Sequence, residues 1–138
     1  MNASAADALD ILVGEWLTVP DVAERLGTDP SKVRRIVQER RLVGSRRGDP
    51  RVFSIPEAFL VPGHLANPAQ PTQPDAHAPW TVLASLQGTL TVLSDAGFAD
   101  DEAIEWLFTA QEALPGTPIE ALRAGRKTEI RRLAAAEL

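Results

Sequence analysis

Hydrophobic side chains recur at helical spacing in three short segments of the first third of the chain, residues 5–13, 18–26 and 30–41. In each segment they mark one face, while polar and charged side chains occupy the other, as in helices that pack on a core. The apolar positions of the three faces are Leu9, Leu12, Val13, Val22, Ala23, Leu26, Val33, Ile36 and Val37. The pattern therefore predicts three helices in close succession.

Capping signals delimit the second and third of these helices. Thr18 and Asp21 resemble a capping box with Asp in place of the usual Glu, and Pro20 falls in the first turn, where its missing N–H costs little. Gly27 suits the left-handed position that ends a helix, and Asp29 before a proline suits the start of the next. A turn of about three residues between two helices is typical of a helix-turn-helix.

Two short β-prone runs, Leu42–Val43 and Val52–Ile55, follow the third helix. Glycine, aspartate and proline within residues 44–51 are typical of a turn that joins two strands. The same turn contains three arginines, Arg46, Arg47 and Arg51. A hairpin directly after two capped helices predicts a winged helix-turn-helix over residues 1–61.

The pattern breaks down over residues 62–79, where five prolines and no aliphatic periodicity predict an extended linker. Apolar residues return at helical spacing over residues 80–96. Acidic residues from Asp100 onward and a Thr-Pro-Ile-Glu capping box at Thr117 then predict the starts of later helices. Residues 80–138 are therefore predicted to form a bundle of about four helices, and the whole chain to be mainly α with a small β-hairpin wing.

Positive charge is concentrated in one part of the chain. The chain has 14 Lys and Arg against 19 Asp and Glu, a net charge of −5. Nine of the 14 basic residues precede Pro56, and eight of them lie from Ser31 to Arg51, where there are only two acidic residues. Because the chain as a whole is acidic, any contact with a polyanion must come from this local patch. The asymmetry also indicates different partners for the two halves.

The third helix sorts its residue types by angle, at 100° per residue. Its aliphatic side chains cluster on one side, and the opposite side carries arginines and an amide. Arginine can form a bidentate contact with guanine and glutamine with adenine, so this face suits the DNA major groove. The wing arginines suit the DNA backbone or the minor groove. The candidate DNA-binding residues are Ser31, Lys32, Arg34, Arg35, Gln38, Arg41, Arg46, Arg47 and Arg51.

The composition argues against enzymatic chemistry. The absence of cysteine excludes thiolate metal sites and cysteine nucleophiles, and both histidines, His64 and His77, lie in the proline-rich stretch. A cluster of carboxylates, Asp100, Asp101, Glu102 and Glu105, could suggest acid–base chemistry or Mg²⁺ binding, but capping and solvation of a helix explain it more simply. We predict no cofactor, no metal site and no catalytic activity.

The chain shows no sign of a membrane or export segment. No apolar run approaches the roughly 18 residues of a membrane-spanning helix, and the first residues lack the basic region of a signal peptide. The sequence thus predicts a cytoplasmic protein, associated with the nucleoid while it is bound to DNA.

The first half resembles the excisionase and MerR-type winged helix-turn-helix. The family has an opening hydrophobic-Thr-x-x-Glu-x-Ala-x-x-Leu-Gly stretch, a Ser-x-x-Thr-Val/x-Arg-x-Ile helix, and a terminal Ile-Pro-x-x-x-Leu element after the wing. The matching residues are Leu17, Thr18, Val22, Ala23, Leu26, Gly27, Ser31, Val33, Arg34, Ile36, Ile55 and Pro56. The resemblance implies a DNA-binding head. The long dimerising coiled coil and effector domain of MerR regulators have no counterpart here, so effector sensing is not implied.

The second half is similar to the C-terminal domain of a family of actinobacterial winged-helix DNA-binding proteins. The similar strings are residues 88–93, 95–98, 105–108 and 114–118. A shorter string, residues 118–126, resembles the toxin-binding domain of Xre/ParS-type antitoxins.

Two hypotheses follow. The first is a sequence-preferring protein that binds double-stranded DNA and regulates transcription, with residues 80–138 used for self-association or a protein contact. The alternative is an antitoxin-like or adaptor protein whose main task is to bind a protein through residues 80–138.

Overall fold

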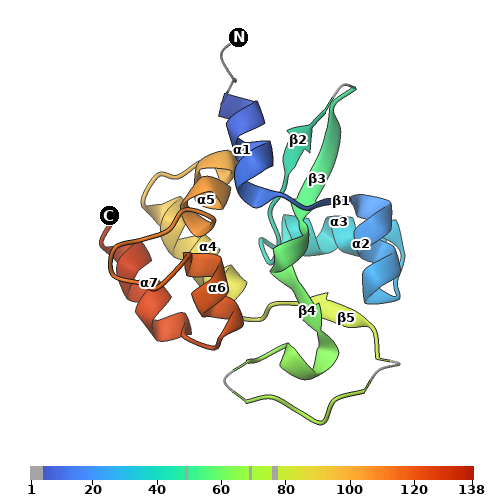
Figure 1. Ribbon diagram of the computed structural model, residues 1–138. Helices are drawn as coiled ribbons and strands as arrows, with labels where there is room; N and C mark the ends of the chain where they lie inside the picture. Colours follow the sequence, from blue (N-terminus) through green and yellow to red (C-terminus); the bar gives the residue numbers. More distant parts are fainter. Residues whose placement is uncertain (1–4, 49, 69, 76–77) are drawn as a thin grey trace.

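The computed structural model describes residues 5–48, 50–68, 70–75 and 78–138 (Figure 1). The predicted turn residue Asp49 and His77 lie outside these ranges. The elements in chain order are α1 (Ala5–Val13), β1 (Trp16–Thr18), α2 (Val19–Leu26), α3 (Pro30–Gln38), β2 (Ser45–Arg47), β3 (Val52–Pro56), the 3-10 helix η1 (Glu57–Phe59), β4 (Leu60–Pro62), the 3-10 helix η2 (Gly63–Leu65), β5 (Trp80–Val82), α4 (Leu86–Asp95), α5 (Asp100–Leu107), α6 (Pro118–Arg123) and α7 (Lys127–Ala135).

The predicted helix-turn-helix is present, and its caps are those expected from the sequence. The Thr18 Oγ1 atom accepts a hydrogen bond from the Asp21 N–H, and the Thr18 N–H donates to Asp21 Oδ2, both at 3.3 Å. Gly27 ends α2 in the left-handed conformation, with φ of 66°. Asp29 Oδ1 accepts from the Lys32 N–H at 3.0 Å and starts α3. Local hydrogen bonds therefore set the boundaries of the two helices in this motif.

The wing belongs to a three-stranded antiparallel sheet with the strand order β1-β3-β2. The predicted strand Leu42–Val43 is wrong, because this pair is fully buried in the segment that leads to the wing and the strand is Ser45–Arg47. The strand β1 is an addition to the prediction. It pairs with Ser54–Pro56 of β3 and so joins the start of α2 to the base of the wing.

A second small sheet connects the two halves of the chain. Residues 80–82, predicted as the beginning of a helix, instead form β5, which pairs antiparallel with β4. The helix α4 begins only at Leu86. The error has a tertiary cause: β4 offers unpaired backbone groups, and pairing with residues 80–82 satisfies them. The predicted linker thus leaves the head at β4 and returns to it (Figure 1).

The C-terminal helices α4 to α7 form the predicted bundle, with α4 packed along α7. Glu102 Oε1 accepts from the Ala99 N–H at 2.9 Å at the start of α5. The capping box predicted at Thr117 is only half formed. Thr117 Oγ1 accepts from the Glu120 N–H, but the Glu120 carboxylate accepts from the Thr117 hydroxyl instead of the backbone.

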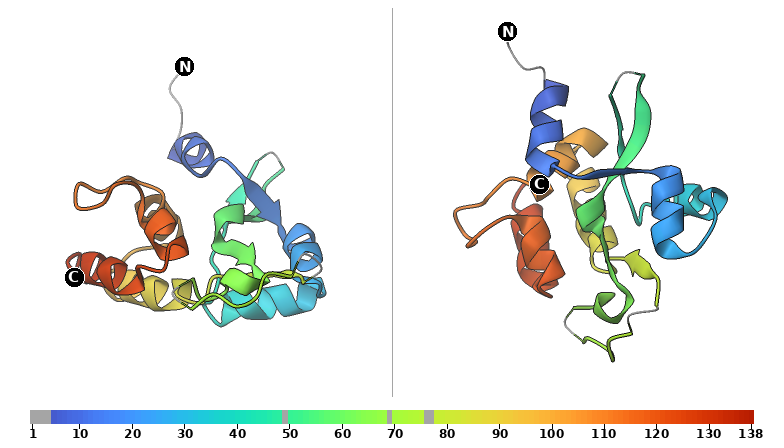
Figure 2. Two further views of the ribbon diagram at one scale, coloured as in Figure 1. Left: turned by 60° about the horizontal axis from the view of Figure 1, so that its bottom comes forward. Right: turned by 45° about the vertical axis from the view of Figure 1, so that its right-hand side comes forward.

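The first part of the chain up to residue 61 (the head) and residues 80–138 (the tail) share one hydrophobic core, and they lie side by side in Figures 1 and 2. Phe59 is fully buried and its ring centroid lies 5.7 Å from that of Phe108 in the tail. Arg123 of α6 donates through Nη1 to the carbonyls of Ala58 and Leu60, at 2.9 and 3.0 Å. In the described part of the chain, no helix is long and apolar enough to cross a membrane.

Candidate nucleic-acid interface

The outer face of α3 is exposed as the sequence predicted. Val33 is fully buried, whereas the predicted contact residues on this helix all face solvent. These exposed residues are Ser31, Lys32, Arg34, Arg35 and Gln38. The helix therefore presents two arginines, a lysine and an amide together, while its aliphatic side packs on the core.

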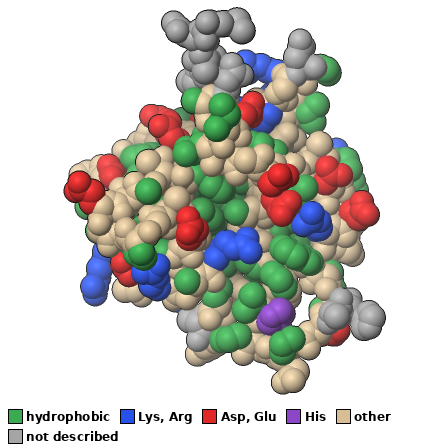
Figure 3. Space-filling model, viewed as in Figure 1, with side chains coloured by type: hydrophobic (Ala, Val, Ile, Leu, Met, Phe, Trp, Pro, Cys, Tyr) green, Lys and Arg blue, Asp and Glu red, His purple; other side chains and the backbone are tan. Residues whose placement is uncertain are grey.

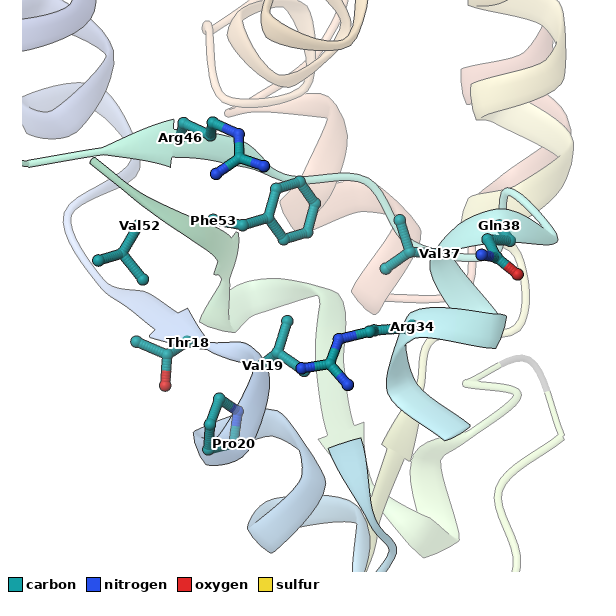
Figure 4. Close-up of a pocket in the computed structure, with 9 residues that line it drawn as sticks. All are labelled: Thr18, Val19, Pro20, Arg34, Val37, Gln38, Arg46, Val52 and Phe53. Carbon is teal, nitrogen blue, oxygen red and sulfur yellow. The ribbon is translucent and has the colours of Figure 1, made fainter. Parts of the chain in front are cut away.

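A groove of about 460 Å³ lies between the start of α2, the outer face of α3 and the wing (Figure 4). Arg34 and Gln38 reach it from α3, and Arg46 reaches it from β2. The remaining lining residues are Thr18, Val19, Pro20, Val37, Val52 and Phe53. Figure 4 shows Arg34 extending toward the start of α2. The fold thus gathers three of the predicted contact residues, 12 positions apart in sequence at most, around one concave surface.

Arg46 and Arg47 are neighbours in β2 but face opposite sides. Arg46 is exposed, whereas the Arg47 side chain is only 7% exposed. The Arg47 Nε donates to Asp10 Oδ1 of α1 at 2.6 Å, and its guanidinium lies 5.1 Å from the centre of the Trp16 ring. Arg47 therefore anchors the wing to α1 and β1. Its burial does not support the predicted DNA contact, and the proposed interface omits it.

The two remaining candidates lie outside the groove. Arg41 is exposed just beyond α3, and Arg51 is exposed near the tip of the wing. A second hollow, on the tail side of the wing, brings Arg46 and Arg51 near Asp100 and Asp101 of α5. The acidic tail residues and the basic wing residues that line this hollow are about 50 positions apart in the sequence. No local sequence signal predicts that they lie close together.

The opposite side of the molecule has a different character. Figure 3, viewed as Figure 1, shows acidic and basic side chains interspersed with hydrophobic ones. The helix α3 lies behind the sheet in this view, and the two further views of Figure 2 place it on the far face. Among the described side chains visible in Figure 3, the two signs of charge are interspersed and form no single-sign patch suited to a polyanion.

Two family models match the chain. "DNA-binding protein Rv2175c, wHTH domain" matches residues 3–60, and "Rv2175c C-terminal domain of unknown function" matches residues 83–137. The chain is also 35% identical, over 130 residues, to DNA-binding protein Rv2175c of Mycobacterium tuberculosis (strain ATCC 25618 / H37Rv), covering 86% of this chain and 77% of the relative. This chain belongs to the Rv2175c family. The NMR structure of Rv2175c superposes on it with a TM-score of 0.68 at 32% identity, covering 88% of this chain and 80% of that one.

The family assignment bears on several predictions. It confirms the mainly α fold with a winged helix-turn-helix and a C-terminal helical region. It also confirms that the winged helix-turn-helix is followed by a C-terminal domain that matches the same Rv2175c family. The finer resemblances, of the head to excisionase and MerR proteins and of the tail to Xre/ParS antitoxins, are not confirmed by these comparisons.

Proposed function

We propose that this Rv2175c-family protein is a sequence-preferring DNA-binding protein that regulates transcription. Support comes from the winged helix-turn-helix at residues 3–60 and from a relative named as a DNA-binding protein. The observation that carries the proposal is the shared groove: Arg34 and Gln38 of the exposed α3 face meet Arg46 of the wing there. The family match favours DNA binding over the antitoxin-like alternative.

The proposed contacts divide by chemistry. On α3, Ser31, Arg34, Arg35 and Gln38 face the base edges of the major groove, because arginine and glutamine side chains make bidentate contacts there. Cations at the margins hold phosphates or enter the minor groove. These marginal residues are Lys32, Arg41, Arg46 and Arg51. The protein acts where its DNA lies, so we also propose a cytoplasmic location, at the nucleoid while bound.

The domain division of this proposal follows the sequence: a head over 1–61, a linker over 62–79 and a tail over 80–138. A single winged module covers few base pairs, and tight specific binding favours a dimer. The tail is therefore proposed to support self-association or to contact a protein partner. Light scattering of the full chain with and without DNA tests self-association. A mass that corresponds to one protein chain per specific duplex would exclude self-association.

The test of the interface is the double variant Arg34→Ala plus Arg35→Ala in the full chain. Both side chains are exposed, so the fold should persist while binding to labelled duplexes falls and sequence preference is lost. Fluorescence anisotropy at about 50 and about 200 mM salt also measures the slope of affinity with salt, which should fall by roughly one unit per lost phosphate contact.

The matched control is Lys127→Ala plus Arg132→Ala, which removes two exposed cations from α7. This control should bind like the unaltered protein. If the α3 double variant keeps both its affinity and its preference, α3 is not the reading helix. If the unaltered protein binds no duplex at low salt, the proposed function itself fails.

A further inference from the structure

Arg40, just after α3, has an unusual backbone conformation. With φ of 63°, it is the one non-glycine residue with a positive φ in the described part of the chain. The left-handed region brings the Cβ of an L-residue close to the following carbonyl oxygen, which costs free energy that glycine avoids. The other described residues with positive φ are all glycines, including Gly27 at the end of α2. Arginine at this position therefore needs an explanation beyond the turn itself.

The position is the one that usually holds glycine at the end of a helix. The Arg40 N–H donates to the Val37 carbonyl at 3.0 Å, and the Arg41 N–H donates to the Ile36 carbonyl at 3.1 Å. This pair of bonds is the Schellman pattern, in which the left-handed residue stops the helix. The sequence predicted a helix that continues to about residue 41, and this turn is why α3 ends at Gln38.

The side chain of Arg40 reaches the C-terminal bundle. Its Nη2 donates to Asp100 Oδ1, the first residue of α5, at 2.9 Å. Both side chains are nearly half exposed, at 42% and 46%. An ion pair as exposed as this one adds little to stability, because water and salt screen it. The pair joins the end of α3 to the start of α5.

A second tie holds the preceding residue. The Gln87 side chain of α4 donates through Nε2 to the Glu39 carbonyl at 3.1 Å. This carbonyl belongs to the C-terminal end of α3, where the helix leaves its last acceptors without partners. Two consecutive residues at the end of α3 are thus bound by two different helices of the tail.

We propose that the C-terminal bundle positions α3 for DNA recognition, with Arg40 as the positioning residue and Asp100 and Gln87 as its supports. The inference rests on the proposed DNA-binding function and gives a role to the domain described as of unknown function. Gln38 lies only two residues before Arg40, so a loose helix end displaces this amide more than the residues at the start of α3. Sequence preference therefore depends on the ties more than overall electrostatic affinity does.

The test uses Arg40→Gly and Asp100→Asn in the full chain. Glycine favours the left-handed turn, so Arg40→Gly should preserve the end of α3 and the melting temperature of the protein. The variant removes only the side-chain contact with Asp100. Asp100→Asn leaves the Arg40 charge in place. Both variants should reduce the ratio of affinities for a preferred duplex and its scrambled version by about two- to tenfold, with an unchanged salt slope for Asp100→Asn.

The matched control is Asp101→Asn, which changes the neighbouring exposed carboxylate; among the described residues, no ion pair joins Asp101 to α3. This control should leave the ratio unchanged. Hydrogen exchange of the Glu39 to Arg41 amides gives a measure independent of DNA and should be faster in Asp100→Asn than in Asp101→Asn.

Three results would overturn the inference while leaving DNA binding intact. The first is an unchanged ratio in both Arg40→Gly and Asp100→Asn. The second is an equal loss in Asp101→Asn. The third is a salt slope lowered by one unit in Arg40→Gly together with tighter binding by Asp100→Asn, because Arg40 would then contact a phosphate directly. A failure of the unaltered protein to bind DNA would instead reject the proposed function.

Discussion

Two adjacent arginines of β2 show how much a single position decides at the residue scale. Arg46 faces the groove, and Arg47 is buried against Asp10 and Trp16. We expect Arg46→Ala to weaken DNA binding and lower the salt slope by about one unit without changing the melting temperature. We expect Arg47→Ala to lower the free energy of unfolding by about 1–2 kcal/mol, because buried packing and the cation–π contact are lost.

The cost at Arg47 stays moderate because Asp10 is 42% exposed and water can solvate it once its partner is gone. Circular dichroism during heating and anisotropy with labelled DNA, on both variants side by side, separate the two roles. Equal melting temperatures for the two variants would mean that Arg47 does not anchor the wing. The buried position of Arg47 also explains why a count of wing arginines overstates the charge available to DNA.

At the scale of elements, the wing depends on a glycine at its base. A Cβ added at Gly44 would lie 2.5 Å from the Ser54 carbonyl oxygen and 2.7 Å from Cζ of Phe53. Backbone at this distance must move, so we expect Gly44→Ala to lower the free energy of unfolding by about 1–3 kcal/mol. Urea denaturation measures this change, and weaker DNA binding should accompany it because β2 carries Arg46.

Gly88→Ala in α4 serves as the comparison for Gly44→Ala. A Cβ there would also be too close to another group, at 2.2 Å from Nη2 of Arg131, but this group ends a long exposed side chain that can move away. Alanine also suits a helix better than glycine. Gly88→Ala should therefore be neutral or slightly stabilising. A loss as large as that of Gly44→Ala would contradict the distinction between rigid and movable neighbours.

At the scale of the whole molecule, the two family regions share one core. Phe59 of the head is fully buried and contacts Phe108 of the tail. We expect Phe59→Ala to cost about 3–5 kcal/mol, as large aromatic truncations in a core do. This is a large part of the total stability of a domain, and it should destabilise both halves together.

Tryptophan fluorescence can follow each half separately. Trp16 lies in β1 of the head and Trp106 in α5 of the tail, so variants that retain only Trp16 or only Trp106 of the chain's three tryptophans report on one half each. The two tryptophan probes should report the same urea midpoint as each other, both when Phe59 is present and in the Phe59→Ala background. Midpoints that separate would mean that head and tail unfold independently, and the positioning of α3 by the tail would then lose its physical basis.

Features whose physical causes are local could be predicted from the amino-acid sequence. Side-chain caps at Thr18 and Asp29 place helix starts through hydrogen bonds within three residues, and amphipathic spacing selects the buried face of α3. The exposed outer face of α3, which carries the predicted DNA-binding residues, follows from the same spacing. The proline-rich stretch lies between the two matched family regions, which end at residue 60 and begin at residue 83.

Features that depend on partners distant in the chain could not be predicted in this way, because they arise only when the chain folds. The strand β5 forms because β4 offers it backbone partners, although its residues have helical spacing. Arg47 is buried because Asp10, 37 residues earlier, accepts from it. Arg40 ends α3 in a left-handed turn while its side chain meets Asp100, 60 residues later. Local propensity carries no information about such contacts, since chain folding brings their two sides together and the free energy of the shared core keeps them there.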